Sequence, residues 1–388
     1  MPKYFLILLL SVPVLGAQTT GETILQSYER VFIRSNLNTK VNVLSDAAED
    51  EAAALFYGPL CATALRFVTE NASLFRDDPD MLNVTVIAVR GVGEYAYNPA
   101  AEILWQVFLQ FPDNTVRYEI LDVLFLLDAS SIAEKIAEFL EETNRRYNSG
   151  LPPDYQILSA LFTILGRAGN DASYPALFAS SLVLPEHLKK EAMEAFYKID
   201  GDLTAFLLGV IIHNPPAEKL FAFRLALDSD AFSKEEKGTL AEAALEAALL
   251  VPGDRRSEIR DLAGESLVLI GKTEWIRALP HVLKYYNQHF IAFGADLSAK
   301  QPLLSAISCL GFLRSTEAAR TLALQLGIYN SRYSTLGTEE QEVVLAIINS
   351  LGQLGYKAAY DTLHYAGIIP YPEEITEAAR KALAMLKW

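Results

Sequence analysis

The sequence predicts an all-α fold: a right-handed α/α superhelix, or solenoid, of about eight helix-pair repeats with capping helices at its ends. Two observations predict it. Apolar residues recur at helical spacing through most of the 388 residues, and the segments they form are separated by regularly spaced junctions that mostly carry glycine. Sustained period-two alternation and hairpin dipeptides are scarce, which disfavours a β fold. With 51% apolar residues the chain has ample material for a core.

Residues 1–17 are predicted to be a cleaved signal peptide. One basic residue, Lys3, precedes the apolar run Tyr4–Leu15, and the small residues Gly16 and Ala17 end it. This run is shorter than the roughly 20 apolar residues that span a bilayer, although a retained membrane anchor remains the alternative. We therefore expect a periplasmic or secreted protein with no membrane span in the mature chain.

Residues 18–78 fall outside the glycine spacing and are interpreted as an N-terminal helical cap. Ile24–Ile33 is expected to form one helix and Glu49–Thr69 a longer one, bridged by a Val/Asn/Ser stretch. In the segment 77–80, Asp78 or Asp80 is expected to cap the next helix. A cation-binding loop is the alternative, but this segment lacks the glycine and the trailing glutamate of an EF-hand.

Residues 79–369 form the predicted repeat region. The junctions lie 35, 38, 35, 70, 40 and 41 residues apart, at Gly93, Asp128, Gly166, Gly201, Gly271, Gly311 and Gly352. Because 70 is twice 35, one repeat with an eroded junction is expected between 213 and 253, with helices at Phe221–Leu227 and Leu240–Leu250. The other helix pairs are Leu82–Gly93 with Ala100–Phe108, Val116–Leu127 with Ile132–Tyr147, Ile157–Leu165 with Ala172–Ala179, Leu188–Ile199 with Leu203–Ile212, Ile259–Ile270 with Thr273–Phe290, Leu303–Leu310 with Ser315–Leu326, and Val343–Gly352 with Tyr356–His364.

Each junction glycine is expected to supply the left-handed backbone that ends the first helix of its pair. A two-helix unit cannot bury its apolar face alone, so each unit must stack on its neighbours. Residues 370–388, with one amphipathic helix at Glu373–Leu386, are expected to close the C-terminal end of the stack.

The repeat unit resembles the HEAT repeat, particularly its short bacterial form. The resemblance rests on first helices that end in Leu-Gly, as at Leu165-Gly166 and Leu351-Gly352, and on Ala-x-x-x-Leu second helices such as Ala359–Leu363. It covers roughly residues 80–388, and the motif is degenerate. The resemblance implies a curved superhelix used for protein recognition and names no catalytic activity.

Two glycine motifs mimic phosphate-binding loops. Gly91-Val92-Gly93 follows an apolar run as a dinucleotide-binding turn would, but Pro99 stands where the phosphate-binding helix should continue. Gly271-Lys272-Thr273 lacks the required glycine five positions earlier, where Ser266 stands. Both are interpreted as repeat junctions.

The residues that usually carry catalysis or metal binding do not converge. None of the five histidines lies in a His-Glu-x-x-His motif, and there is no Gly-x-Ser-x-Gly. Cys61 and Cys309 lie on apolar helical faces far apart in the repeat order, so both are expected to be buried, unpaired thiols. We therefore expect no cofactor, no metal and no enzymatic activity. The alternative is an enzyme or small-ligand binder with a pocket between repeats.

Charge is the remaining signal. The formal net charge of −15 disfavours nucleic-acid binding. From residue 251 onward there are 14 basic and 14 acidic residues, so the whole excess lies in residues 1–250, with 19 basic and 34 acidic. In the helix expected at 274–290, the apolar stripe is Ile276, Leu279, Leu283, Tyr286 and Phe290, with cations on the opposite face.

These features lead to a functional hypothesis: an exported, non-enzymatic scaffold that recognises a protein or peptide partner in the cell envelope. Neutral local charge with exposed cations and aromatic residues is typical of interfaces, although a merely solvated polar face is the alternative. The predicted partner-binding residues are Arg277, His281, Lys284, Arg332 and Tyr333.

Overall fold

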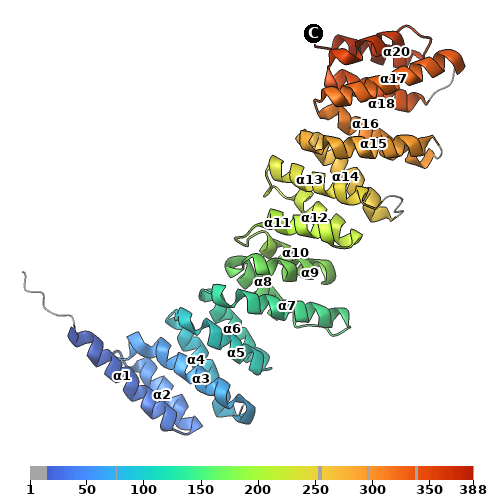
Figure 1. Ribbon diagram of the computed structural model, residues 1–388. Coiled ribbons are helices and arrows are strands. Elements are labelled where there is room, and N and C mark those ends of the chain that lie inside the picture. The colour runs from blue at the N-terminus through green and yellow to red at the C-terminus, as the bar shows by residue number, and fades with distance from the viewer. Residues whose placement is uncertain (1–14, 76, 252–255, 295–296, 337–339, 388) are drawn as a thin grey trace, which may run out of the picture. The chain divides into compact units, whose positions relative to one another are not determined.

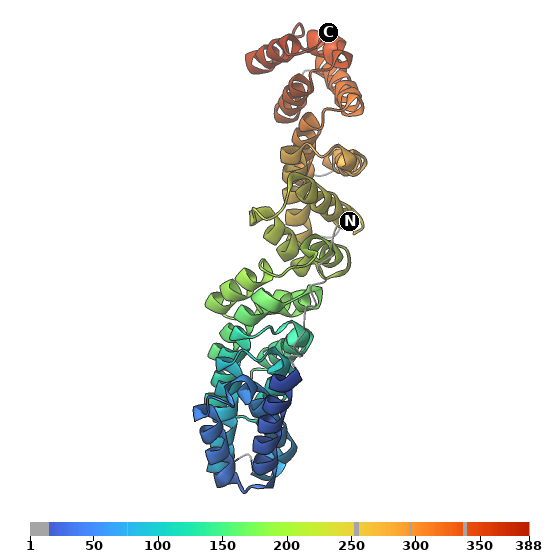
Figure 2. The same cartoon turned by 90° about the vertical axis from the view of Figure 1, so that its left-hand side faces the viewer.

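The computed structural model describes residues 15–75, 77–251, 256–294, 297–336 and 340–387. Within these ranges it has twenty α-helices, seven short 3-10 helices and no strand, apart from one isolated bridge between Tyr356 and Lys387 (Figures 1 and 2). The predicted all-α fold is confirmed. The chain divides into two compact units, Met1–Gly201 and Asp202–Trp388.

The first unit is a stack of helices in two layers. The even-numbered helices contact one another in succession from α2 to α10, while α1, α3 and α5, and then α7 and α9, pack in the other layer. The helices are α1 (Leu15–Arg34), α2 (Leu37–Glu49), α3 (Tyr57–Phe75), α4 (Pro79–Glu94), α5 (Ala101–Gln110), α6 (Asn114–Leu126), α7 (Ala133–Asn148), α8 (Tyr155–Ala168), α9 (Tyr174–Val183) and α10 (Glu186–Phe196).

The second unit repeats this arrangement. The even helices again contact one another in succession, from α12 to α20, and the odd helices form the other layer. The helices are α11 (Leu203–His213), α12 (Pro216–Asp228), α13 (Lys234–Leu249), α14 (Ser257–Thr273), α15 (Leu279–Phe293), α16 (Lys300–Phe312), α17 (Thr316–Leu336), α18 (Gln341–Leu354), α19 (Tyr360–Ala366) and α20 (Glu373–Ala384).

All eight predicted repeats appear as two helices each, including the one with the eroded junction, which is α12 followed by α13. There the link between helices carries no glycine. Instead Ser233 begins α13 with a capping box, in which its side chain accepts from the Glu236 backbone N–H and the Glu236 carboxylate accepts from the Ser233 backbone N–H. This N-terminal cap sets where α13 begins.

The packing pairs are offset by one helix from the pairs predicted along the sequence. Of its two neighbours along the chain, a helix that ends at a junction packs more closely on the helix before it than on the helix after it, as α14 does on α13 and α4 on α3. The 3-10 turns that follow the junctions, such as Asn98–Ala100 after α4, redirect the chain into the other layer. Between helices adjacent in sequence, the second helix of one repeat therefore pairs with the first helix of the next.

The expectation that junction glycines adopt left-handed backbone is wrong. Among the described residues, positive φ angles occur at Gly150 and Gly355 and at three non-glycine residues, whereas Gly166 and Gly352 are helical. A Cβ atom at Gly166 would lie 3.1 Å from the Cα of Ala195 on α10, and one at Gly352 would lie 3.1 Å from the Cα of Ala382 on α20. Glycine at these sites lets neighbouring even helices approach each other closely.

The N-terminal region differs from the prediction. The Val/Asn/Ser stretch expected to bridge two helices is itself the helix α2, and residues 50–53 interrupt the segment expected to be continuous from Glu49 to Thr69. Val43, Leu44 and Ala47 are buried on α2, so a sufficient apolar face outweighs the weak helix propensity of valine and asparagine. Helices α1, α2 and α3 therefore form the N-terminal part of the two-layer stack.

The predicted signal peptide falls mostly outside the described residues, because residues 1–14 are not described and α1 begins at Leu15. None of the helices described is both long and apolar enough to cross a membrane. The expected cap of α4 is confirmed at Asp78, whose side chain accepts from the backbone N–H of Asp80 at 2.8 Å.

Both cysteines are buried and unpaired, as predicted. Cys61 on α3 is fully buried and Cys309 on α16 is 3% exposed. Burial raises the pKa of each thiol to about 12, because a thiolate would lose its hydration. The two thiols therefore behave as small apolar core groups.

Candidate functional site

Three of the five predicted partner-binding residues, Arg277, His281 and Lys284, lie in the 3-10 turn before α15 and in its first turns. Arg277 lies in the 3-10 turn Ile276–Ala278, and its side chain is 69% exposed. Its guanidinium carbon lies 5.5 Å from the centre of the Trp275 ring, and its Nε lies 4.0 Å from Glu242 on α13. The Trp275 indole N–H donates to the same carboxylate at 2.7 Å. Arg277 is thus partly engaged within its own unit.

On α15 itself, Lys284 is exposed and His281 is half-buried. The apolar stripe differs from the one predicted: Leu279, Val282, Tyr285 and Tyr286 are buried, whereas Ile276 is 49% exposed. Ile276 precedes the α-helix, in a 3-10 turn whose residues do not follow the 100° helical step. The cations of α15 therefore share their surface with an exposed isoleucine.

The other two predicted residues, Arg332 and Tyr333, lie side by side on α17 and have different surroundings. The Tyr333 hydroxyl donates to the carbonyl oxygen of Pro370 at 3.1 Å, and its ring lies 4.1 Å from that of Tyr371. Tyr333 therefore holds the segment after α19 against α17. Arg332 is exposed and lines a groove between α17 and α19.

This groove, which we call the α17–α19 groove, has a volume of about 540 Å³. One wall is a stripe along α17 with four-residue spacing, and the other comes from the 3-10 turn Lys357–Ala359 and the start of α19. The lining residues are Arg320, Ala323, Leu324, Gly327, Ile328, Ser331, Arg332, Ala358, Asp361 and Thr362.

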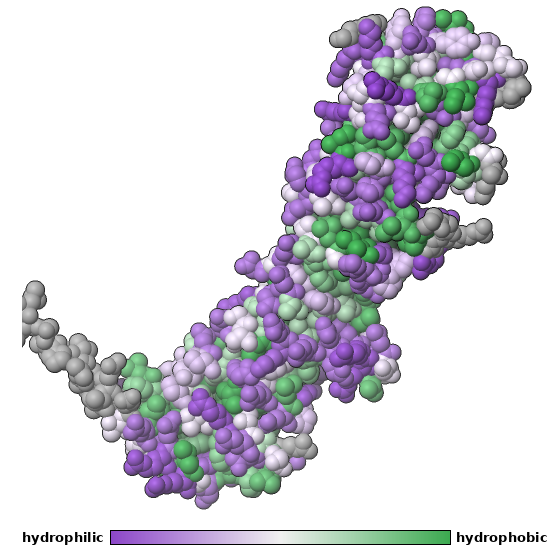
Figure 3. Space-filling view, in the orientation of Figure 1, coloured by the Kyte–Doolittle hydropathy of each residue, from purple (hydrophilic) through white to green (hydrophobic). Residues whose placement is uncertain are grey.

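Apolar side chains are exposed in the α17–α19 groove. Leu324 is 71% and Ile328 is 38% exposed. Figure 3 shows hydrophobic residues interleaved with hydrophilic ones on the face of this unit that it presents. Single exposed leucines are ordinary, but here they line a concave surface bounded by charges.

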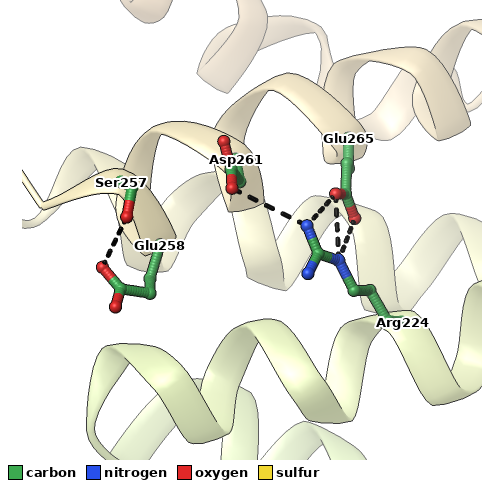
Figure 4. Close-up of polar contacts among 5 residues, drawn as sticks. All are labelled: Arg224, Ser257, Glu258, Asp261 and Glu265. Carbon is green, nitrogen blue, oxygen red and sulfur yellow. Dashed lines mark hydrogen bonds and ion pairs between the residues drawn. The ribbon is translucent and has the colours of Figure 1, made fainter.

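The two arginines of the groove differ from other cations of the same unit in their ion pairing. Arg224 on α12 forms a two-point contact with Glu265 on α14, with Nη2 at 2.6 Å and Nε at 3.0 Å from Oε1, and lies 3.7 Å from Asp261 (Figure 4). Lys300 pairs with Glu340 and Glu342. Within the described ranges, Arg320 and Arg332 have no such carboxylate within ion-pair distance.

Sequence reasoning found Arg332 but missed the rest of the stripe. The signal was present, because Arg320, Leu324, Ile328 and Arg332 follow one another at four-residue intervals. Its two apolar residues, Leu324 and Ile328, look like core residues in the sequence. Only the packing of α17 shows that they face solvent.

The first unit contains a smaller cavity of about 190 Å³ between α6, α7 and α8. Its polar lining includes Arg117, whose Nε donates to the carbonyl oxygen of Phe111 at 2.8 Å at the end of α5. Burial lowers the pKa of Arg117. The cavity is smaller than the roughly 300 Å³ at which small-molecule sites begin, and Arg117 already serves as a helix cap.

The motifs that resemble phosphate-binding loops lie within helices. Gly91 and Gly93 are in the last turns of α4, and a Cβ atom at Gly91 would lie 2.5 Å from the Cys61 sulfur. Gly271-Lys272-Thr273 ends α14. In the described part of the chain, no three His, Cys, Asp or Glu side chains are grouped so that they could hold a metal ion.

Neither a protein-family model nor a curated protein matches this chain. It is similar to an engineered protein of known crystal structure, at 13% identity over 93% of this chain and 98% of that one, with a TM-score of 0.33. It is also similar to a chain from a structure of the cadherin and β-catenin interaction, at 11% identity over 94% and 96% of the two chains, with a TM-score of 0.29. For a chain of a SYS-1/POP-1 complex, the identity is 11% over 87% and 64%, with a TM-score of 0.31.

Proposed function

We propose that this protein is a non-enzymatic scaffold that binds a protein or peptide partner through the odd-helix face of its second unit. The observation that carries the proposal is the α17–α19 groove, which exposes Leu324 and Ile328 between two arginines that have no ion-pair partner among the described residues. Such a combination of apolar contact area and unsatisfied Arg groups suits a protein interface.

The dimensions of the groove favour a macromolecular partner. Arg320 and Arg332 are twelve residues apart on one helix, which places their Cα atoms about 18 Å apart at about 1.5 Å per residue. A small metabolite would not reach both arginines, whereas a peptide segment would. The cations of α15 lie in the same layer of the second unit and would extend the contact surface.

The proposal has two finer parts. The repeats are of the HEAT type, which the Leu-Gly first helices and the Ala-rich second helices support. The protein works outside the cytoplasm, in the periplasm or secreted, on a partner in the cell envelope. The basic, apolar and small-residue pattern of residues 1–17 supports this location. N-terminal sequencing of the protein recovered after cell fractionation tests it, and a Met1 N-terminus on cytoplasmic protein would contradict it.

Site-specific photo-crosslinking in cells tests the binding function. A photoreactive phenylalanine analogue replaces Leu324 on the groove or Lys284 on α15, and a matched control carries it at the exposed Glu138 on α7 of the first unit. We expect discrete crosslinked protein bands from the first two positions and none from the control. Absence of any crosslinked polypeptide at both test positions, with normal folding of the variants, would refute the proposed function.

A further inference from the structure

The α17–α19 groove has a defined charge arrangement. Arg320 stands towards one end of the stripe and Arg332 at the other, with Leu324 and Ile328 one and two turns after Arg320. One carboxylate, Asp361, lines the opposite wall on α19. It lies beyond ion-pair distance of both arginines. The ends of the stripe are therefore cationic and its middle apolar.

The floor of the groove is made of small groups. Ala323 is 5% exposed, Gly327 lies one turn later, and Ala358 and Thr362 face them from the other wall. A Cβ atom at Gly327 would have Thr362 Cγ2 as its nearest neighbour, at 3.5 Å, so a side chain there would point toward α19 across the groove. Small residues on a helix surface allow another helix to approach closely.

Glycine inside a helix costs roughly 1 kcal/mol relative to alanine. At the junction glycines this cost accompanies tight packing, but at Gly327 an alanine Cβ would make only ordinary contact. The packing of the unit itself therefore does not require glycine at position 327.

We infer that the α17–α19 groove binds an amphipathic helix of a partner protein that carries carboxylates about three turns apart and apolar residues between them. This rests on the proposed scaffold function and names the class of partner. Arg binds carboxylates in a two-point geometry that Lys cannot provide. Leu324 and Ile328 contact the apolar face of the partner helix, as in other helix-in-groove complexes. Asp361 excludes a carboxylate from the middle of the partner segment.

The experiment is a selection from a phage-displayed library of random 16-residue peptides on the full-length protein. We expect enriched sequences with Asp or Glu about eleven residues apart and apolar residues at i and i+4 between them. The most enriched peptide, synthesised with a fluorescent label, is then titrated by anisotropy against the wild type and the variants. Enrichment of sequences without this acidic spacing, or no enrichment at all, would overturn the inference.

Two kinds of variants locate the binding. Gly327→Leu fills the groove, and Arg320→Glu with Arg332→Glu reverses its charge; each should weaken binding by about tenfold or more. The matched control is Arg260→Glu on α14, also an exposed arginine reversed in the same unit, which should change the affinity less than twofold. If Gly327→Leu impairs folding, Leu324→Lys serves instead, since a side chain that is 71% exposed contributes little to the core.

The outcomes separate the groove from the general function. Unchanged peptide binding in the groove variants would refute this site. If the crosslinking experiment at Leu324 and Lys284 still captured a protein, the scaffold function would stand without it. Loss of binding in Arg260→Glu as well would show that only the overall charge attracts the peptide.

Discussion

The junction glycines provide the sharpest test of how the helices pack. Gly352 and Gly264 both lie inside helices of the second unit, in α18 and α14, and replacing either with alanine makes the same chemical change. At Gly264 a Cβ atom would meet nothing within 4 Å, whereas at Gly352 it would lie 3.0 Å from the Ala382 Cβ and 3.1 Å from its Cα. The close neighbour at Gly352 includes backbone, which cannot move aside by changing a rotamer.

The magnitudes follow from two opposing effects. Replacing glycine with alanine inside a helix stabilises by about 0.5–1 kcal/mol, through helix propensity and reduced freedom of the unfolded chain. Overpacking a close helix contact destabilises by about 1–3 kcal/mol. We therefore expect Gly264→Ala to be slightly stabilised and Gly352→Ala to be neutral or destabilised, with a difference of about 1–3 kcal/mol between them.

Hydrogen exchange measured by mass spectrometry is the appropriate assay, because stacked repeats open locally rather than in one global transition. Gly352→Ala should accelerate exchange in peptides from α18 and α20, and Gly264→Ala should slow or leave unchanged the exchange in α14. Equal protection in the two variants would show that close approach of the even helices does not depend on glycine, and the packing argument would be wrong.

Three further predictions concern buried and capping groups. Cys61 and Cys309, with pKa values raised to about 12 by burial, should resist iodoacetamide at pH 8 in the native protein and both react in denaturant without prior reduction; rapid native labelling or an unlabelled pair would contradict this. Lys219→Met should lower local stability by about 1–3 kcal/mol, because Nζ donates at 2.6 Å to two carbonyl oxygens at the end of α11, and unchanged hydrogen exchange there would contradict it. Ser233→Ala should destabilise α13 by about 1 kcal/mol at neutral pH. Since hydrogen bonds from Ser233 lower the pKa of Glu236, the contribution of that carboxylate is present above the usual glutamate pKa and is lost as the pH falls through the folded-state value. Denaturation of Ser233→Ala and of the wild type at pH 7 and pH 3 checks this. An equal loss of unfolding free energy at both pH values would contradict a stabilising role of the capping box.

The proposed binding surface could be predicted only in part from the sequence. The cation spacing on α15 and the identity of Arg332 were visible in the sequence, since polar residues on one helix face follow from a 100° step per residue. The sequence did not separate Tyr333, whose hydroxyl donates to Pro370, from Arg332 beside it, because Pro370 belongs to a segment more than thirty residues away. Nor did it show that Leu324 is exposed while Leu322, two residues earlier, is fully buried.

In the repeat region, the sequence by itself determined the helices, their order and their repeat, because amphipathic period and local caps such as Asp78 act over a few residues. It also determined that Cys61 and Cys309 are core residues. Only the tertiary structure decided which helices pair and what the glycines are for. Pairing depends on where the 3-10 turns redirect the chain, and the tight contact at Gly166 or Gly352 comes from the backbone of a helix about thirty residues away in sequence. The α17–α19 groove was likewise visible only in the tertiary structure. Its two walls belong to different helices, and the distance between them is set by packing, which no local sequence pattern encodes.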